Sequence, residues 1–297
     1  MTSIHSLRVT KGESFSLKQF PTTLEPLYSG KKDFREEMEE RLEEVDDLQT
    51  KMYAHDRYGL LLIFQAMDAA GKDGTIKDVM SGVNPHGVVV SAFKKPSDNE
   101  LDHDFMWRTN LELPQRGRMG IHNRSWYEEV LVVKVHPEIL TRYQRLPAEL
   151  VSDPEKAFDR RYHHIRNHES YLYDEGIRVV KFFLHLSRAE QARRFLERLD
   201  TPSKNWKFAE GDVKERGFWN DYQKAYEKAI QETASEQAPW YVIPADDKKN
   251  MRLLVVDAIL YELRALNLSY PVIDEVKQAE FEKYRTQLLA EIAEDEG

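Results

Sequence analysis

One short stretch constrains the fold of this chain more than any other: an apolar run that ends in a turn of small residues, followed by Gly71 and Lys72. It reads Leu60-Leu61-Leu62-Ile63-Phe64-Gln65-Ala66-Met67-Asp68-Ala69-Ala70-Gly71-Lys72-Asp73-Gly74-Thr75. An apolar run that does not alternate predicts a strand buried on both faces of a parallel sheet. A small-residue turn between a strand and a helix is typical of a phosphate-binding loop, where backbone N–H groups and a lysine hold an anion. We therefore expect phosphoryl binding or transfer.

The loop departs from the usual pattern at two positions. Ala66 stands where a glycine is usual, five residues before Gly71, and Asp73 follows the lysine in place of a serine or threonine. Thr75 lies two residues further on. A carboxylate inside the loop, Asp68, would be repelled by phosphates unless it binds a metal ion or takes a proton. On spacing alone, a tight strand-to-helix turn with a surface lysine remains the alternative.

Length and composition exclude several classes of protein. A chain of 297 residues holds one large domain or two small ones. Its net charge of −9 argues against a general nucleic-acid binder, and no apolar run is long enough to span a membrane. The absence of cysteine excludes disulfides, thiolate catalysis and cysteine-ligated zinc. The N-terminus lacks the apolar core of a signal peptide, so we expect a cytoplasmic location.

The spacing of apolar residues predicts alternating strands and helices. Between residues 33 and 54, for example, apolar side chains recur at intervals of three and four, as on one face of a helix, which leaves room for a dimer contact. The expected strands are 60–65, 88–93, 119–123, 178–186 and 240–243. The expected helices are 33–54, 75–80, 98–107, 124–135, 158–175, 188–199, 217–233, 250–268 and 274–294.

This alternation predicts an α/β fold, specifically a P-loop kinase-like three-layer α/β/α sandwich with a five-stranded parallel sheet and a helical lid. We expect a single domain over residues 1–297, with an irregular segment at 1–30. The polar, turn-rich stretch 201–211 and its flanks suggest a lid module at about 188–216.

Ligands bind at the carboxyl ends of parallel strands, so candidate site residues are sought where the expected strands end. The loop itself contributes Asp68, Ala70, Gly71, Lys72, Asp73, Gly74 and Thr75. After the third strand, Asn123 stands where P-loop enzymes often carry a magnesium-binding aspartate, Arg124 could clamp a phosphate, and Glu128 lies one helical turn further on. Asp68, Asn123 and Glu128 are the candidate metal ligands. Glu128 as an ordinary solvated helix residue is an equal alternative.

Basic residues form two further candidate groups. Lys94 and Lys95 follow the second strand, where two lysines suit an anionic chain. The basic helix after the fourth strand and the polar stretch beyond it offer lid cations for a transferring phosphate: Arg193, Arg194, Lys204 and Lys207. For each of these cations alone, a solvated helix face is the alternative.

Several separated motifs follow one another along the chain. They are the loop 66–75, Phe93-Lys94-Lys95-Pro96, His103-Asp104-Phe105-Met106-Trp107-Arg108, Asn123-Arg124-Ser125-Trp126-Tyr127-Glu128, Lys181-Phe182-Phe183-Leu184-His185-Leu186-Ser187, Asn205-Trp206-Lys207-Phe208 and Ala238-Pro239-Trp240-Tyr241-Val242-Ile243-Pro244-Ala245-Asp246-Asp247. Together they resemble the polyphosphate kinase 2 family from about residue 30 to about 270. Motifs in order are more specific than the loop alone.

The resemblance implies transfer of phosphate from inorganic polyphosphate to a nucleotide, with Mg²⁺. It implies functional roles for Lys72 and Asp68. Asn123, at a position that is commonly aspartate in the branch that prefers nucleoside diphosphates, together with Glu128 looks like the third class, whose members phosphorylate both AMP and ADP to form ADP and ATP. The expected partners are thus polyphosphate, AMP, ADP and ATP, in a homo-oligomer that binds neither nucleic acid nor membrane.

Two other functions fit the same residues. An ATP-dependent kinase of the nucleoside monophosphate type would use the same fold and loop with a different donor. A nucleotide- or polyphosphate-binding protein without turnover would hold its ligand in a decayed site. The loop keeps Lys72 and adds carboxylates, which argues against decay.

Overall fold

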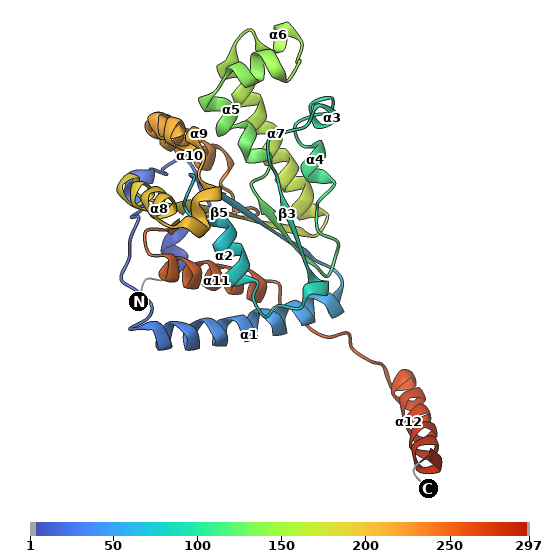
Figure 1. The fold of residues 1–297 in the computed structure, drawn as a ribbon. Helices are drawn as coiled ribbons and strands as arrows, with labels where there is room; N and C mark the ends of the chain where they lie inside the picture. Colours follow the sequence, from blue (N-terminus) through green and yellow to red (C-terminus); the bar gives the residue numbers. More distant parts are fainter. Residues whose placement is uncertain (1–3, 296–297) are drawn as a thin grey trace.

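A computed structural model describes residues 4–295, so both ends of the predicted single domain, 1–3 and 296–297, lie outside the described residues. A six-stranded sheet forms its centre, in the order β1-β6-β5-β2-β4-β3 (Figure 1). The strands are β1 (Arg8–Val9), β2 (Gly59–Ala66), β3 (Val88–Ala92), β4 (Met119–Asn123), β5 (Ile177–His185) and β6 (Trp240–Pro244). The five strands β2 to β6 are parallel, which confirms the predicted parallel sheet.

The sixth strand, β1, was not predicted, and it corrects the expectation that residues 1–30 are irregular. Arg8 and Val9 pair antiparallel with Tyr241 and Trp240 of β6. Two residues are too few to display a period, so the sequence could not reveal the strand. Short 3-10 helices, η1 (Ile4–Leu7) and η2 (Leu17–Gln19), flank it.

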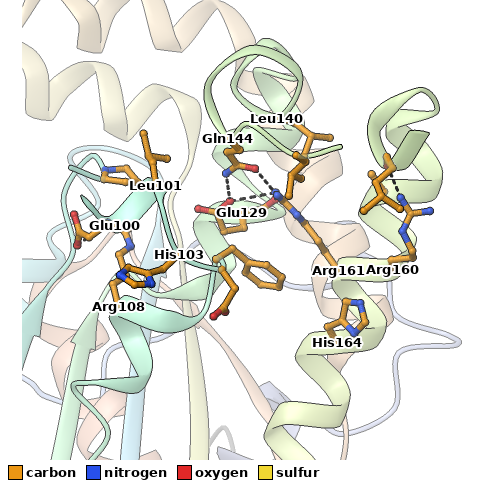
Figure 2. Close-up of a pocket in the computed structure, with 16 residues that line it drawn as sticks. Glu100, Leu101, His103, Arg108, Glu129, Leu140, Gln144, Arg160, Arg161 and His164 are labelled. Atoms are coloured by element: carbon orange, nitrogen blue, oxygen red, sulfur yellow. Dashed lines mark hydrogen bonds and ion pairs between the residues drawn. The ribbon is translucent and has the colours of Figure 1, made fainter. Parts of the chain in front are cut away.

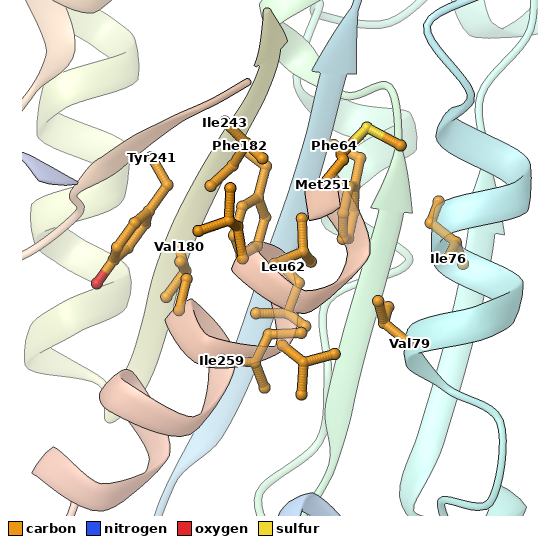
Figure 3. Close-up of a cluster of buried hydrophobic side chains, with 14 of the residues drawn as sticks. Leu62, Phe64, Ile76, Val79, Val180, Phe182, Tyr241, Ile243, Met251 and Ile259 are labelled. Carbon is orange, nitrogen blue, oxygen red and sulfur yellow. The ribbon is translucent and has the colours of Figure 1, made fainter. Parts of the chain in front are cut away.

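Helices cover both faces of the sheet, because neighbouring residues of the buried strands point to opposite sides. Leu62, Phe64 and Phe182 face the layer formed by α1 (Lys31–His55), α2 (Lys72–Val79) and α11 (Lys248–Ala265) (Figure 3). Leu61, Ile63 and Phe183 face the opposite layer, which includes α7 (Pro154–Asp174) and α10 (Trp219–Thr233). This is the predicted three-layer arrangement.

The apolar spacing correctly predicts the long helices. They are α1, α7, α10 and α11, together with α8 (Arg188–Asp200) and α12 (Glu275–Asp295). The apolar side of α1 packs on α11 in the same chain, with Val45 and Met52 fully buried, so this side is not open for a dimer contact. Among residues 4–295, no helix combines the length and the apolar character that a membrane crossing needs.

Three expected segments differ in the structure. The helix expected at 98–107 is two short ones, α3 (Asp98–Leu101) and α4 (Trp107–Asn110). The helix expected at 124–135 divides into the 3-10 helix η4 (Trp126–Glu129) and α5 (Val132–Val135), because Arg124 is left-handed and Ser125 extended. The polar stretch 201–211 is mostly helical, with η6 (Pro202–Lys207) and the start of α9 (Glu210–Glu215).

Short elements complete the chain between and beyond these. They are η3 (Pro85–Gly87), the π-helix η5 (Ile139–Tyr143), α6 (Ala148–Val151) and η7 (Arg216–Phe218).

A buried ion pair joins the sheet to the helical layer that carries η4. Lys181 of β5 and Glu169 of α7 are 0% and 2% exposed, and Lys181 Nζ lies 2.5 Å from Glu169 Oε2. Lys181 Nζ also donates to the Thr233 carbonyl oxygen at 2.8 Å, and the Tyr127 hydroxyl donates to Glu169 Oε1 at 2.7 Å. Each buried charge is therefore paired and hydrogen-bonded, and Tyr127 ties η4 to the pair.

We predict that Glu169→Gln lowers the free energy of unfolding by about 3 kcal/mol, because it leaves the Lys181 ammonium buried without a counter-charge. The double variant Glu169→Leu with Lys181→Met removes both charges and should lose much less than the sum of the losses in Glu169→Leu and Lys181→Met alone. Urea denaturation of these four variants measures this. Wild-type stability of Glu169→Gln would contradict the account.

Candidate active site

The loop between β2 and α2 has the backbone shape of an anion-binding turn. Ala69 and Gly71 both adopt positive φ, 63° and 103°. Gly71 then caps α2, which begins at Lys72, three residues earlier than the sequence indicated. Positive φ costs little for glycine, but about 1 kcal/mol or more for alanine, so surrounding contacts must hold Ala69 in place.

Arg194 of α8 supplies those contacts. Its guanidinium donates to the carbonyl oxygens of Ala69 at 3.2 Å and Ala70 at 2.7 Å. It also donates to the carbonyl oxygens of Ala245 at 2.5 Å and Asp246 at 3.1 Å, just past β6. Because the peptide is planar and trans, the N–H of Gly71 points opposite to the Ala70 carbonyl oxygen and therefore away from the Arg194 guanidinium. Arg194 is thus a clamp between the loop and the end of β6.

Four charged side chains meet beside the loop. Arg124 NH2 lies 3.7 Å from Asp68 Oδ1, and its NH1 lies 3.8 Å from Glu128 Oε2. Lys72 Nζ donates to the Ala66 carbonyl oxygen at 3.0 Å. Burial lowers the pKa of the Lys72 ammonium, and the Asp68 carboxylate opposes that shift. The structure therefore brings together the residues that the sequence placed at the ends of two different strands.

Glu128 is less exposed than the other two partners in these ion pairs, with 15% of its side chain exposed against 38% for Asp68 and 39% for Arg124. Burial raises the pKa of its carboxyl, against the pull of Arg124 and Lys72. Gln65, the one polar side chain of β2, reaches it: the amide nitrogen donates to Glu128 Oε1 at 2.8 Å, and the amide oxygen accepts from Ser125 Oγ at 3.2 Å. Glu128 is consequently held toward the loop, and the solvated alternative is wrong.

Asn123 ends β4, as predicted, and contacts the loop directly. Its Nδ2 donates to Asp73 Oδ1 at 2.6 Å. This leaves the Asn123 amide oxygen as its available acceptor. His122, the residue before it, is fully buried, and its Nε2 lies 3.0 Å from the Glu112 carbonyl oxygen. Burial lowers the pKa of His122 to about 4, so its imidazole is neutral at pH 7.

A cleft of about 700 Å³ opens over the loop. Nine lysine and arginine residues line it, against three aspartate and glutamate residues. The cations are Lys72, Lys94, Lys95, Arg124, Arg194, Arg198, Lys204, Lys248 and Arg252. In a chain whose net charge is −9, this concentration of positive charge suits a polyanion and little else.

Not every predicted residue reaches the cleft. The Thr75 side chain is buried, and its hydroxyl donates to the Gly71 carbonyl oxygen at 3.0 Å. Arg193 points elsewhere and pairs with Glu190 at 2.8 Å. Arg194 lines the cleft, but its donors are engaged in the clamp. The side chain of Lys207 lies outside what the structure describes.

Sequence reasoning missed Arg198, Lys248 and Arg252. The last two lie in the first turns of α11, which Asp247 caps directly after β6. The rule that ligands bind at strand ends, applied to β6 as it was to the other strands, would have found them. Arg198 lies one turn beyond Arg194 on α8 and has no motif of its own.

A second, smaller pocket of about 200 Å³ adjoins the cleft, and Asp68 and Arg124 line both. Glu128, Gln191, Tyr222 and Tyr226 also line this pocket. No sequence motif marks the tyrosines, which come from α10 and face the loop only in the folded chain. Two pockets that share two charged side chains can hold two substrates with their reacting groups adjacent.

A third hollow lies between α3–α4 and the N-terminal half of α7 (Figure 2). Its polar groups bind one another: Arg161 NH1 lies 3.1 Å from Glu129 Oε2, and Gln144 contacts both residues. None of the residues predicted for the site lines it. It therefore supports Glu129, the neighbour of Glu128, rather than offering cations to an anion.

Comparison with known proteins agrees with this geometry. The family model described as Polyphosphate kinase 2 (PPK2) matches residues 28–270. The chain is 50% identical over 286 residues to a protein of Rhodopseudomonas palustris named ADP-polyphosphate phosphotransferase, covering 95% of this chain and 97% of that one. It is 42% identical over 265 residues to a Meiothermus ruber protein named AMP/ADP-polyphosphate phosphotransferase, covering 89% and 94%.

The fold has a counterpart among solved structures. The crystal structure of polyphosphate kinase 2 from Arthrobacter aurescens TC1 superposes with a TM-score of 0.84 at 37% identity, and the match covers 97% of each chain. The three-layer fold and the resemblance noted in the sequence are both confirmed.

The buried neutral His122 predicts a pH dependence of stability. Its pKa is about 4 in the folded chain and about 6.5 when unfolded, so the unfolded state binds more protons between these values. Stability therefore falls as the pH drops through this window, by about 3 kcal/mol at pH 4 from this residue alone. A His122→Gln variant should lack this component. Unfolding curves of the two proteins at pH 7 and pH 4.5 give the fall in the free energy of unfolding between these pH values. This fall should be smaller in the variant, and an equal fall in both proteins would refute the prediction.

Proposed function

This chain belongs to the polyphosphate kinase 2 family, and on that premise we propose that it moves the terminal phosphoryl group of inorganic polyphosphate to AMP and ADP. AMP then gives ADP, and ADP gives ATP, as in the third class of the family. The observation that carries the proposal is the cleft over the loop, where nine cations gather in an acidic chain. A polyphosphate chain has the charge density and the length to fill such a cleft.

We assign the large cleft to the donor. Lys94 and Lys95, both exposed, lie at its entrance beside β3, and Lys204 and Arg198 face them from the lid side. Arg198, Lys248 and Arg252 take the phosphate-binding role that the sequence suggested for Arg193. Residues 188–216 then form the lid module, whose first helix also carries the Arg194 clamp.

We assign the smaller pocket to the acceptor nucleotide. Its aromatic side chains, Tyr222 and Tyr226, suit a nucleoside, and Arg124 at the shared wall suits the acceptor phosphate. An oxygen of that phosphate forms a bond to the terminal phosphorus, while the bond from that phosphorus to the bridging oxygen of polyphosphate breaks. The polyphosphate leaves one unit shorter. Lys72 and Arg124 stabilise the negative charge on the transferring group.

The acidic residues of the site fit Mg²⁺. Asp68 and Glu128 supply carboxylates and Asn123 an amide oxygen, the ligand types that this ion prefers. Among residues 4–295, no three His, Asp or Glu side chains come close enough to hold a metal alone, so phosphate oxygens would complete the coordination. When bound, the ion would offset charge on both the phosphates and Glu128, the pKa of whose carboxyl is raised by burial.

The proposal also covers the location, the assembly and the partners of the protein. We place the protein in the cytoplasm, where its nucleotide acceptors are held, as a homo-oligomer without nucleic-acid or membrane partners. The net charge of −9 would repel both nucleic acid and anionic membrane surfaces outside the cleft.

We predict that Lys72→Met lowers kcat for ATP formation from polyphosphate and ADP by about a hundredfold or more, because a charge that contacts the transferring group is lost. Lys77→Met, an exposed lysine of the same helix, is the matched control and should be near wild type. Asp68→Asn and Arg124→Met should fall with Lys72→Met. Near-normal turnover in all three folded variants would contradict the roles assigned to these residues.

Removing a cation from the cleft entrance should weaken donor binding rather than chemistry. For Lys94→Gln with Lys95→Gln we expect the KM for polyphosphate to rise about tenfold, while kcat and the KM for ADP change little. Lys224→Gln with Lys228→Gln, which removes two cations of α10 outside the cleft, controls for net charge. The effect should shrink at high salt, since exposed charges are screened. A drop in kcat with an unchanged polyphosphate KM would show that the cleft is assigned to the wrong substrate.

A further inference from the structure

One side of α8 holds three successive carbonyl oxygens of the loop between β2 and α2. Arg194 donates to those of Ala69 and Ala70. Gln191 lies one turn earlier on the same side of the helix, and its Nε2 donates to the Asp68 carbonyl oxygen at 2.9 Å. The Gln191 side chain is uncharged and buried, so it is none of the cations that attract a phosphate. Its place behind the loop needs a different reason.

The other end of the Gln191 amide contacts the base of the lid module, where the first and last lid residues, Arg188 and Arg216, meet. Arg216 NH1 donates to Gln191 Oε1 at 2.7 Å and to the Arg188 carbonyl oxygen at 3.1 Å. A primary amide donates at one end and accepts at the other, whereas a carboxylate only accepts and an ammonium only donates. Gln191 therefore has the chemistry to link the base of the lid to the loop.

The contact with Asp68 fixes the direction of one peptide. Because that peptide is planar and trans, the N–H of Ala69 points opposite to the Asp68 carbonyl oxygen and therefore away from Gln191. Ala69 lines the large cleft, and Gln191 lines the smaller pocket. In the described part of the chain, the N–H groups of Ala69 and Gly71 donate to no backbone carbonyl oxygen. Both N–H groups can therefore donate to an anion, provided that the loop keeps this shape.

We propose that Gln191 is a positioning residue for phosphoryl transfer, which holds the peptide between Asp68 and Ala69 and ties it to the base of the lid module. It acts through the loop. The Ala69 N–H is held ready for a phosphate of the donor, and the Asp68 carboxylate is held 3.7 Å from Arg124. Loss of this support lowers kcat more than substrate binding, because small errors of position matter most in the transition state. This kinetic effect rests on the proposed function.

Gln191→Glu separates this role from a merely structural one. The carboxylate keeps Arg216 as a partner but cannot donate to the Asp68 carbonyl oxygen. We expect kcat for ATP formation from polyphosphate and ADP to fall about tenfold, with the KM for polyphosphate within about twofold of wild type. Gln191→Met loses both contacts and should fall at least as far. Arg193→Gln changes the net charge of α8 equally on its exposed side and is the matched control. Near-normal kcat in Gln191→Glu would overturn the proposal, because anchoring Arg216 would then suffice.

Hydrogen exchange at single amides tests the loop geometry without using activity. The Ala70 N–H donates to the Met67 carbonyl oxygen at 3.2 Å and closes the turn that contains Asp68 and Ala69. In Gln191→Glu we expect the Ala70 N–H to exchange at least about tenfold faster, while the amides of β2 exchange as in wild type. Unchanged exchange at Ala70 would overturn the proposal even if kcat fell. A wild-type chain that forms no product from polyphosphate would contradict the proposed function instead, and the exchange experiment would still decide the role of Gln191.

Discussion

The site depends on one interaction, the contact of Arg194 with four backbone carbonyl oxygens. Two of these belong to the loop after β2 and two to the chain just past β6, so a single guanidinium joins the ends of two strands. It holds Ala69 in a left-handed conformation and leaves the Gly71 N–H pointing away from the guanidinium. The same loop carries Asp68 and Lys72, which lie beside Arg124. The clamp thus supports the loop shape on which the charge cluster depends.

The burial of the charges decides what the site can do. Arg124 lies between two carboxylates, Asp68 and Glu128, and with Lys72 the site has two positive and two negative groups, which nearly balance one another. The surplus positive charge lies outward, along the walls of the cleft. A strongly anionic donor is therefore attracted to the walls, while the balanced centre exposes both signs to the reacting phosphates. This division suits transfer between two anionic substrates, which repel each other in water.

Much of the fold could be predicted because its central strands are buried on both faces. β2 and β6 are apolar runs, β5 is mostly apolar, and the long helices have clear spacing. The failures have local causes. β1 has two residues, too few for a pattern. The segment after β4 has helical composition, but the left-handed Arg124 and the extended Ser125 interrupt it to turn the chain over the loop.

The residues of the candidate site also fall into those that the sequence could predict and those that it could not. Lys72, Asn123 and Glu128 could be found because they follow strands whose ends must meet. The roles of neighbouring arginines could not: Arg193 and Arg194 differ by one residue, yet one is 70% exposed at its side chain and the other 4%. Only the position of carbonyl oxygens more than a hundred residues away separates them. The tyrosines of the smaller pocket likewise need the folded chain to reach the loop.

In the proposed reaction polyphosphate, and no nucleoside triphosphate, donates the phosphoryl group. The most direct measurement follows AMP, ADP and ATP with time after the protein is mixed with polyphosphate, AMP and Mg²⁺, with no triphosphate added. We expect ADP to rise first and ATP after it, while polyphosphate shortens. An absence of product in this mixture, with ADP formed once ATP replaces polyphosphate as the donor, would contradict it.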